Sequence, residues 1–175
     1  MGEDHYLVPK QTGGSEKNIE FSITADSVDN AEDLFVSAKD RLLDVNNWAQ
    51  CAGITDTRVM LADVRQKPLH RNAHPRDHIC VIITDTRPVA DRLVIGAIEY
   101  DDYPDDMRES LAIHIQPADV VTVEASTTIV IDRTGKTLVA SYHGRNEPLS
   151  ETKDTNAWLG LSDVQWSSLL QGFLK

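Results

Sequence analysis

The order of hydrophobic patterns along the chain limits the fold more than any single motif does. One strand pattern is followed by one or two helical segments, then by about six strand patterns, and the chain ends in another helical pattern. Strands and helices do not alternate one by one, which argues against a doubly wound parallel sheet of βαβ units. The order predicts an α+β fold, an antiparallel sheet of about six or seven strands with helices on one face.

Alternation of apolar and polar residues, or runs of β-branched residues, mark the strands. They are expected at residues 19–24, 58–64, 79–83, 93–100, 111–115, 120–131 and 136–143. The last two are predicted to form a hairpin, because Asp132-Arg133-Thr134-Gly135 suits a turn with a positive φ at the glycine. The acidic segment 101–106 contains Pro104 and is expected to be a solvated loop.

Two amphipathic helices are predicted, one after the first strand and one at the C-terminus. The first begins at Asp26 or Ser27 and carries an apolar stripe of Ala31, Leu34, Phe35, Ala38, Leu42 and Val45. A further short helical turn at 48–52 is expected to end at Gly53. In the C-terminal helix, Ser162 and Gln165 match a capping box, and the stripe is Val164, Trp166, Leu169, Leu170 and Phe173.

Length and charge exclude several classes of protein. The 175 residues suffice for a single domain, expected at 18–175 after a flexible lead-in at 1–17. The net charge of -11 argues against nucleic acid as a partner, because phosphates are bound by clustered Lys and Arg. We expect neither a membrane span nor export, because long apolar runs and a signal-peptide pattern are absent. The two cysteines, Cys51 and Cys80, suit the reducing cytoplasm.

Several short segments resemble the START-like superfamily, also called SRPBCC or Bet v 1-like. They are Phe21-Ser22-Ile23, Leu34-Phe35, Asp44-Val45-Asn46-Asn47-Trp48 and Gln165-Trp166, and the order of elements agrees from residue 19 onward. The chain also resembles an uncharacterised bacterial subgroup of this superfamily, in the segments His143-Gly144-Arg145-Asn146-Glu147 and Gly160-Leu161-Ser162. The resemblance implies a helix-grip fold, in which a curved antiparallel sheet wraps around the C-terminal helix with a pocket between them. The superfamily includes lipid carriers, hormone receptors, cyclases and ring hydroxylases, so the resemblance implies no single chemistry.

Five residues are expected to contribute to this pocket: Trp48, His114, Tyr142, Arg145 and Trp166. The two tryptophans come from the first and last helical regions, where large aromatics form core or cavity wall. With period two, His114 points away from its apolar neighbours and is a surface or cavity-wall group. Arg145 either binds an anionic head group of the ligand, or pairs with Glu147, or anchors the adjoining loop together with Glu147. The short C-terminal helix leaves open whether the pocket is closed.

No metal site or cofactor is predicted. His70, His74 and His78 recur every four residues, but Pro75 opposes the helix that would bring them together, so a solvated loop is expected. The acids Asp101, Asp102, Asp105 and Asp106 lack the spacing of an EF-hand calcium loop. Glycine-rich phosphate loops and the motifs of serine hydrolases and zinc proteases are absent from the sequence.

Three functions remain open at this stage. The leading hypothesis is the binding of a small apolar or amphipathic molecule in the pocket. The second is an enzyme on the same fold, of cyclase or hydrolase type, that uses His114, His143 or an acid, with no catalytic residue assigned. The third is a protein-interaction module, homodimers included, that uses the sheet edge or the Trp158-Leu159 patch.

Overall fold

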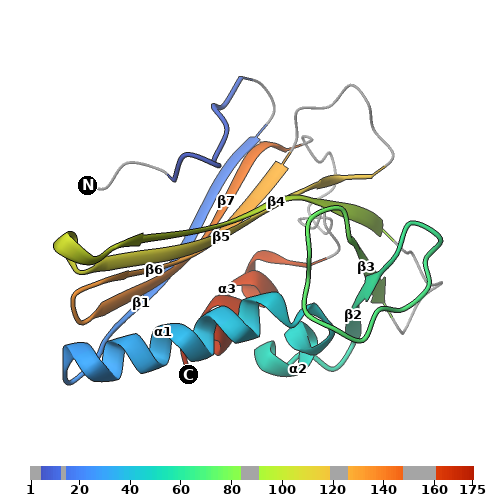
Figure 1. Cartoon of the computed structure of the whole chain (residues 1–175). Helices are drawn as coiled ribbons and strands as arrows, with labels where there is room; N and C mark the ends of the chain where they lie inside the picture. Colours follow the sequence, from blue (N-terminus) through green and yellow to red (C-terminus); the bar gives the residue numbers. More distant parts are fainter. Residues whose placement is uncertain (1–4, 13–14, 84–90, 119–125, 148–160) are drawn as a thin grey trace.

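In the described part of the chain, seven strands form one curved antiparallel sheet in the order β1-β7-β6-β5-β4-β3-β2 (Figure 1). The computed structural model describes residues 5–12, 15–83, 91–118, 126–147 and 161–175. The strands are β1 (Ser15–Thr24), β2 (Thr57–Ala62), β3 (His78–Ile83), β4 (Asp91–Tyr103), β5 (Arg108–Pro117), β6 (Ser126–Thr134) and β7 (Thr137–Glu147). The pairing of β1 with β7 places the first strand beside the last.

A β-bulge contributes to the bend of the sheet. The register between β4 and β5 shifts between Ile95 and Ala97, with Gly96 as the extra residue. A bulge of this kind bends its strand and increases the local twist. A Cβ at this glycine would lie 3.3 Å from the side-chain amide nitrogen of Gln116, so the small residue also avoids crowding.

One buried arginine holds two hairpin turns together at the end of the sheet. Arg133, in β6, donates hydrogen bonds from Nη1 to the carbonyl oxygens of Met107 (3.2 Å) and Gly135 (3.0 Å). Its Nη2 donates to Glu109 at 3.1 Å. Gly135 has a φ of 60°, as the predicted turn requires. The guanidinium therefore ties the β6–β7 turn to the β4–β5 turn, which contains the 3-10 helix η2 (Pro104–Asp106).

The two longer helices lie on the same side of the sheet (Figure 1). Ser27 caps α1 (Val28–Leu43) by accepting a hydrogen bond from the backbone of Asn30. Ser162 and Gln165 form the predicted capping box of α3 (Asp163–Phe173). Between α1 and β2 lie the 3-10 helix η1 (Val45–Asn47) and α2 (Trp48–Ala52). No helix in the described ranges is both long and apolar enough to cross a membrane.

The core lies between the sheet and these helices. It combines the inward side chains of the strands with the apolar stripes of α1 and α3. The largest fully buried side chains are Trp48, Tyr142, Phe35, Phe173, Leu42, Leu61, Ile79, Ile95, Ile113, Ile115, Ile129 and Ile131. We call the side of the sheet that faces the helices the inner face, and the opposite side the outer face.

The predicted fold class is confirmed, and the structure moves several element boundaries. β1 begins at Ser15, within the range expected as a lead-in. β4 continues to Tyr103, where a loop was expected, because pairing with β5 outweighs the low strand propensity of aspartate. The start of the strand predicted at 120–131 and the Trp158-Leu159 patch lie outside the described residues.

The close approach of α3 to α2 predicts an unusual effect of a glycine substitution. A Cβ at Gly172 would lie 2.3 Å from the carbonyl oxygen of Cys51. Glycine to alanine normally stabilises a helix, but here it forces α2 and α3 apart. We expect Gly172→Ala to lower the free energy of unfolding by roughly 1–3 kcal/mol in urea denaturation. Ser167→Ala, in the same helix, is the control, and an equal effect of both variants would contradict the prediction.

Candidate functional site

Three of the five predicted pocket residues meet on the inner face. The ring of Tyr142, from β7, lies 4.8 Å from the ring of Trp166 in α3. The ring of Trp166 lies 6.3 Å from that of Trp48 in α2, at an interplanar angle of 70°. Phe173 completes the group at 6.0 Å from Trp48. We call these four side chains the aromatic cluster. The two contacts of Trp48 are edge-to-face, and the contact of Tyr142 with Trp166 is tilted by 46°.

The aromatic cluster contains a buried polar contact. The hydroxyl of Thr127 donates a hydrogen bond to the phenolic oxygen of Tyr142 at 3.2 Å. Trp48 anchors its indole by donating from Nε1 to the carbonyl oxygen of Leu42 at 3.0 Å. The inner face at this end of the sheet is therefore a packed, mainly apolar region that contains a pair of hydroxyl groups, and Trp48, Tyr142 and Trp166 are only 1–3% exposed. Small-molecule sites also combine aromatic surface with a few polar groups.

The other two predicted residues, His114 and Arg145, lie on the outer face. Side chains alternate between the two faces along a strand. On β7, Tyr142 faces inward, so Arg145 faces outward. On β5, Ile113 and Ile115 face inward, so His114 between them faces outward. The structure therefore separates these two side chains from the aromatic cluster by the thickness of the sheet.

His114 is a partly buried histidine in the outer face. Its Nδ1 lies 3.0 Å from the hydroxyl of Thr128, its register partner on β6. Burial disfavours the charged imidazolium and lowers the pKa of His114 below its ordinary value of 6.5. The Thr128 hydroxyl also donates a long hydrogen bond of 3.5 Å to the carbonyl oxygen of Leu7, which belongs to residues 5–12. The N-terminal segment thus crosses the outer face near this histidine.

Arg145 is buried among backbone carbonyls. Its side chain is 3% exposed, and Nη1 donates to the carbonyl oxygens of Gly144 (2.9 Å) and Lys17 (3.4 Å). Nη2 lies 3.5 Å from the carboxylate of Glu16, whose side chain is 49% exposed. The sequence suggested Glu147 as the partner of this arginine, but that side chain is outside the described part. The observed contacts attach the end of β7 to the beginning of β1.

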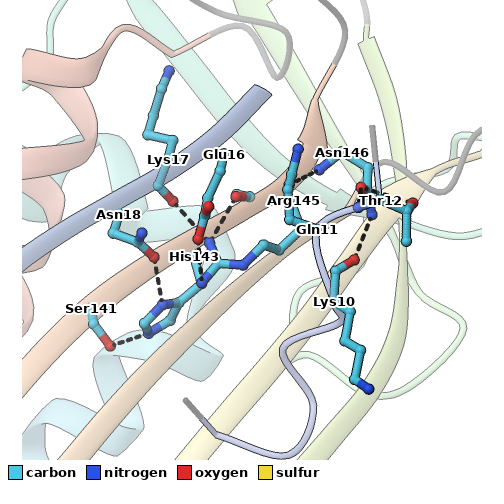
Figure 2. A network of polar contacts seen from close by, with 11 residues as sticks. Lys10, Gln11, Thr12, Glu16, Lys17, Asn18, Ser141, His143, Arg145 and Asn146 are labelled. Atoms are coloured by element: carbon cyan, nitrogen blue, oxygen red, sulfur yellow. Dashed lines mark hydrogen bonds and ion pairs between the residues drawn. The ribbon is translucent and has the colours of Figure 1, made fainter. Parts of the chain in front are cut away.

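A polar network, of which the sequence analysis identified only His143 and Arg145, surrounds this arginine (Figure 2). His143 lies between the side chains of Asn18 and Ser141, at 3.1 and 2.9 Å. Asn146 binds the N-terminal segment through contacts with Lys10, Gln11 and Thr12. Period two on β7 groups Ser141, His143 and Arg145 on one face, but their partners on β1 follow only from the strand register.

The histidine loop between β2 and β3 does not form a metal cluster. Within the described ranges, no three His, Cys, Asp or Glu side chains are grouped to hold a metal ion. Asp77, beside this loop, instead pairs with Arg71 through two contacts of 2.7 and 2.9 Å. Partial burial opposes ionisation of Asp77, but the hydrogen bonds from Arg71 and from the backbone of His74 outweigh it and lower its pKa.

A shallow surface groove lies where β1 joins α1. Its volume is about 420 Å³, and it is lined by Thr24, Ala25, Asp26, Asn30, Asp33, Leu34 and Ser37. None of the five residues predicted to bind a ligand belongs to it. The groove and the aromatic cluster are therefore separate features of the helix side of the molecule.

A curved antiparallel sheet with a C-terminal helix on its inner face defines an α+β helix-grip fold. Among solved structures, the chain is similar to the hypothetical protein jhp0584 from Helicobacter pylori, with a TM-score of 0.54 and 11% identity over 93% of this chain and 87% of that chain. It is also similar to major latex-like protein 151 from Panax ginseng, with a TM-score of 0.43 and 11% identity over 91% of this chain and 93% of that chain. No family model and no curated protein matches the sequence. At 11% identity, the likeness to the Helicobacter protein shows the fold alone.

The partly buried position of His114 predicts a dependence of stability on pH. Because its pKa is lowered on folding, the unfolded chain binds the proton more readily below pH 6.5. Stability is therefore fully present above that pH and decreases as the pH falls below it. In urea unfolding at about pH 7.5 and about pH 5, we expect wild type to lose more stability on acidification than His114→Gln.

The His114→Gln variant is still expected to lose some stability on acidification, because burial also lowers the pKa of His5. Gln116→Ala is the matched control, since it alters the next outward side chain on β5 without removing a titrating group. It is expected to change stability equally at both pH values. An identical loss on acidification in wild type and in His114→Gln would refute the prediction.

Proposed function

We propose that this protein is a cytoplasmic, START-like domain that binds a small apolar or amphipathic molecule on the inner face of its sheet. The observation that carries the proposal is the wall formed by Trp48, Tyr142 and Trp166, in which the Thr127–Tyr142 hydroxyl pair is set. The resemblance of the sequence to START-like proteins supports the same location.

The chemistry of this wall selects the class of ligand. Burying apolar ligand surface against the rings contributes about 25 cal/mol per Å². The Thr127–Tyr142 hydroxyl pair makes one part of this wall polar, which suits a ligand that carries one polar group. A rigid ring system or a short acyl chain with one oxygen satisfies both conditions.

The ligand approaches from the end of the sheet at which α3 begins. Antiparallel pairing places the end of β7 and the start of β6 at this end, and Trp166 lies in the first turns of α3. Arg145 and His114 do not share this wall, because they lie on the outer face. The proposal therefore assigns ligand contact to the three aromatic residues and assigns no anionic head group to Arg145.

Native mass spectrometry of freshly purified protein, followed by denaturing extraction, tests the proposal directly. We expect a retained small molecule, or, after its removal, saturable one-to-one binding of the amphipathic probe 1-anilinonaphthalene-8-sulfonate. Energy transfer from the tryptophans to the probe is expected, because the binding wall contains two of them. Near-UV circular dichroism confirms that the protein remains folded while it binds.

A substitution in the aromatic cluster locates the site. We expect Trp166→Leu to weaken binding of the probe by roughly 2- to 12-fold, the equivalent of an aromatic contact of about 0.5–1.5 kcal/mol. Tyr103→Leu is the matched control, because Tyr103 is an exposed aromatic outside the cluster, and it should bind like wild type. Absence of any retained molecule together with absence of saturable probe binding would refute the proposal, as would equal affinity of wild type and Trp166→Leu.

A further inference from the structure

A serine, a histidine and an asparagine form a hydrogen-bonded relay on the outer face (Figure 2). The hydroxyl of Ser141 lies 2.9 Å from Nε2 of His143, and Nδ1 of the same ring lies 3.1 Å from Oδ1 of Asn18. From this geometry we propose that the outer face holds a second site, in which Ser141 is a nucleophile that accepts an acyl group from a small neutral ester. This site is separate from the proposed ligand wall, which lies on the other side of the sheet.

The partners of the imidazole determine where its proton lies. Oδ1 of Asn18 can only accept a hydrogen bond, so Nδ1 of His143 carries the hydrogen. In the neutral ring, Nε2 is then an acceptor, and the Ser141 hydroxyl donates to it. A nucleophile bonded to a base, with the base held by a third group, is the arrangement that activates serine for acyl transfer.

Strand geometry explains why these side chains meet. Ser141 and His143 are two residues apart on β7, so both point outward, and Asn18 is the register partner of His143 on β1. Ser141 is 7% exposed, while His143 is half-buried and Asn18 is exposed. The relay therefore runs from a nearly buried hydroxyl to the surface at the β1 edge of the sheet.

The charges around the relay define the class of substrate. Glu20 is the register partner of Ser141 on β1 and is exposed, and Glu16 lies two positions before Asn18. These carboxylates, on a chain with a net charge of -11, disfavour an anionic substrate. Arg145, two residues beyond His143 on the same face, is engaged with the carboxylate of Glu16 and the carbonyl oxygens of Gly144 and Lys17, so it does not attract an anionic substrate to this face. A small uncharged ester is the class of substrate that this negative surface admits.

The reaction proceeds in two balanced steps. Ser141 Oγ attacks the acyl carbon while Nε2 of His143 takes the hydroxyl proton, and the ester C–O bond then breaks as that proton passes to the leaving alcohol. In the second step, water adds to the acyl carbon, His143 takes a proton from the water and returns it to Ser141 Oγ, and the carboxylic acid leaves. Asn18 is a positioning residue, since it holds the ring but does not touch the reacting atoms.

Labelling with a fluorophosphonate, in which Ser141 Oγ displaces fluoride from phosphorus, tests the nucleophile in the wild-type protein. We expect one adduct in the intact mass, located on Ser141 by peptide mapping, with Ser22 unlabelled. Ser22 is an exposed serine on the same face at β1 and has no histidine partner among the described contacts, so it measures background reactivity. Equal labelling of both serines, or none on Ser141, would overturn the proposal.

Hydrolysis of p-nitrophenyl acetate tests the relay. We expect Ser141→Ala to abolish it and His143→Gln to slow it by about 100-fold or more, the usual contribution of a general base. Asn18→Leu should slow it, and Asn18→Asp should restore it, because aspartate again accepts from Nδ1. Ser22→Ala should match wild type. Loss of hydrolysis in His143→Gln but not in Ser141→Ala would show that the ring itself reacts, and the proposal would be wrong.

Discussion

The contact of Trp166 with Tyr142 and Trp48 joins three parts of the molecule: the C-terminal helix, the sheet and α2. The C-terminal end of α3 is attached separately, because Arg41 of α1 donates hydrogen bonds to the carbonyl oxygens of Phe173 and Lys175. An eleven-residue helix has little intrinsic stability in water, so these tertiary contacts hold it in place. Because both of its ends are secured, α3 stays on the inner face of the sheet beside α1.

The alternation of side chains along β7 produces two chemically different surfaces from one strand. Leu138, Ala140 and Tyr142 enter the core, while Ser141, His143 and Arg145 form the polar network on the other side. The two proposed sites therefore depend on different neighbours, α3 for one and β1 for the other. A variant at Trp166 and a variant at Ser141 act on opposite faces, so the failure of one proposal leaves the other intact.

Much of the fold could be predicted because its signals are local. The capping box of Ser162 and Gln165, the turn at Gly135 and the stripe around Phe35 each depend on residues near in sequence. The candidate site could be predicted only in part. The expected order of elements was enough to bring the three aromatics together. The same reasoning also assigned His114 and Arg145 to that pocket. It did so because a period of two shows which residues of a strand share a face, but not which face the helices cover.

By itself, the sequence determined the type and order of the elements, the positions of the caps and turns, and the alternation along each strand, since these follow from local propensity and spacing. Tertiary structure alone decided that β1 pairs with β7, that residues 5–12 cross the outer face, and that Asn18 meets His143. The pairing of β1 with β7 joins residues more than a hundred positions apart, and the choice of covered face depends on helices packing against distant strands, so no local pattern encodes either of them.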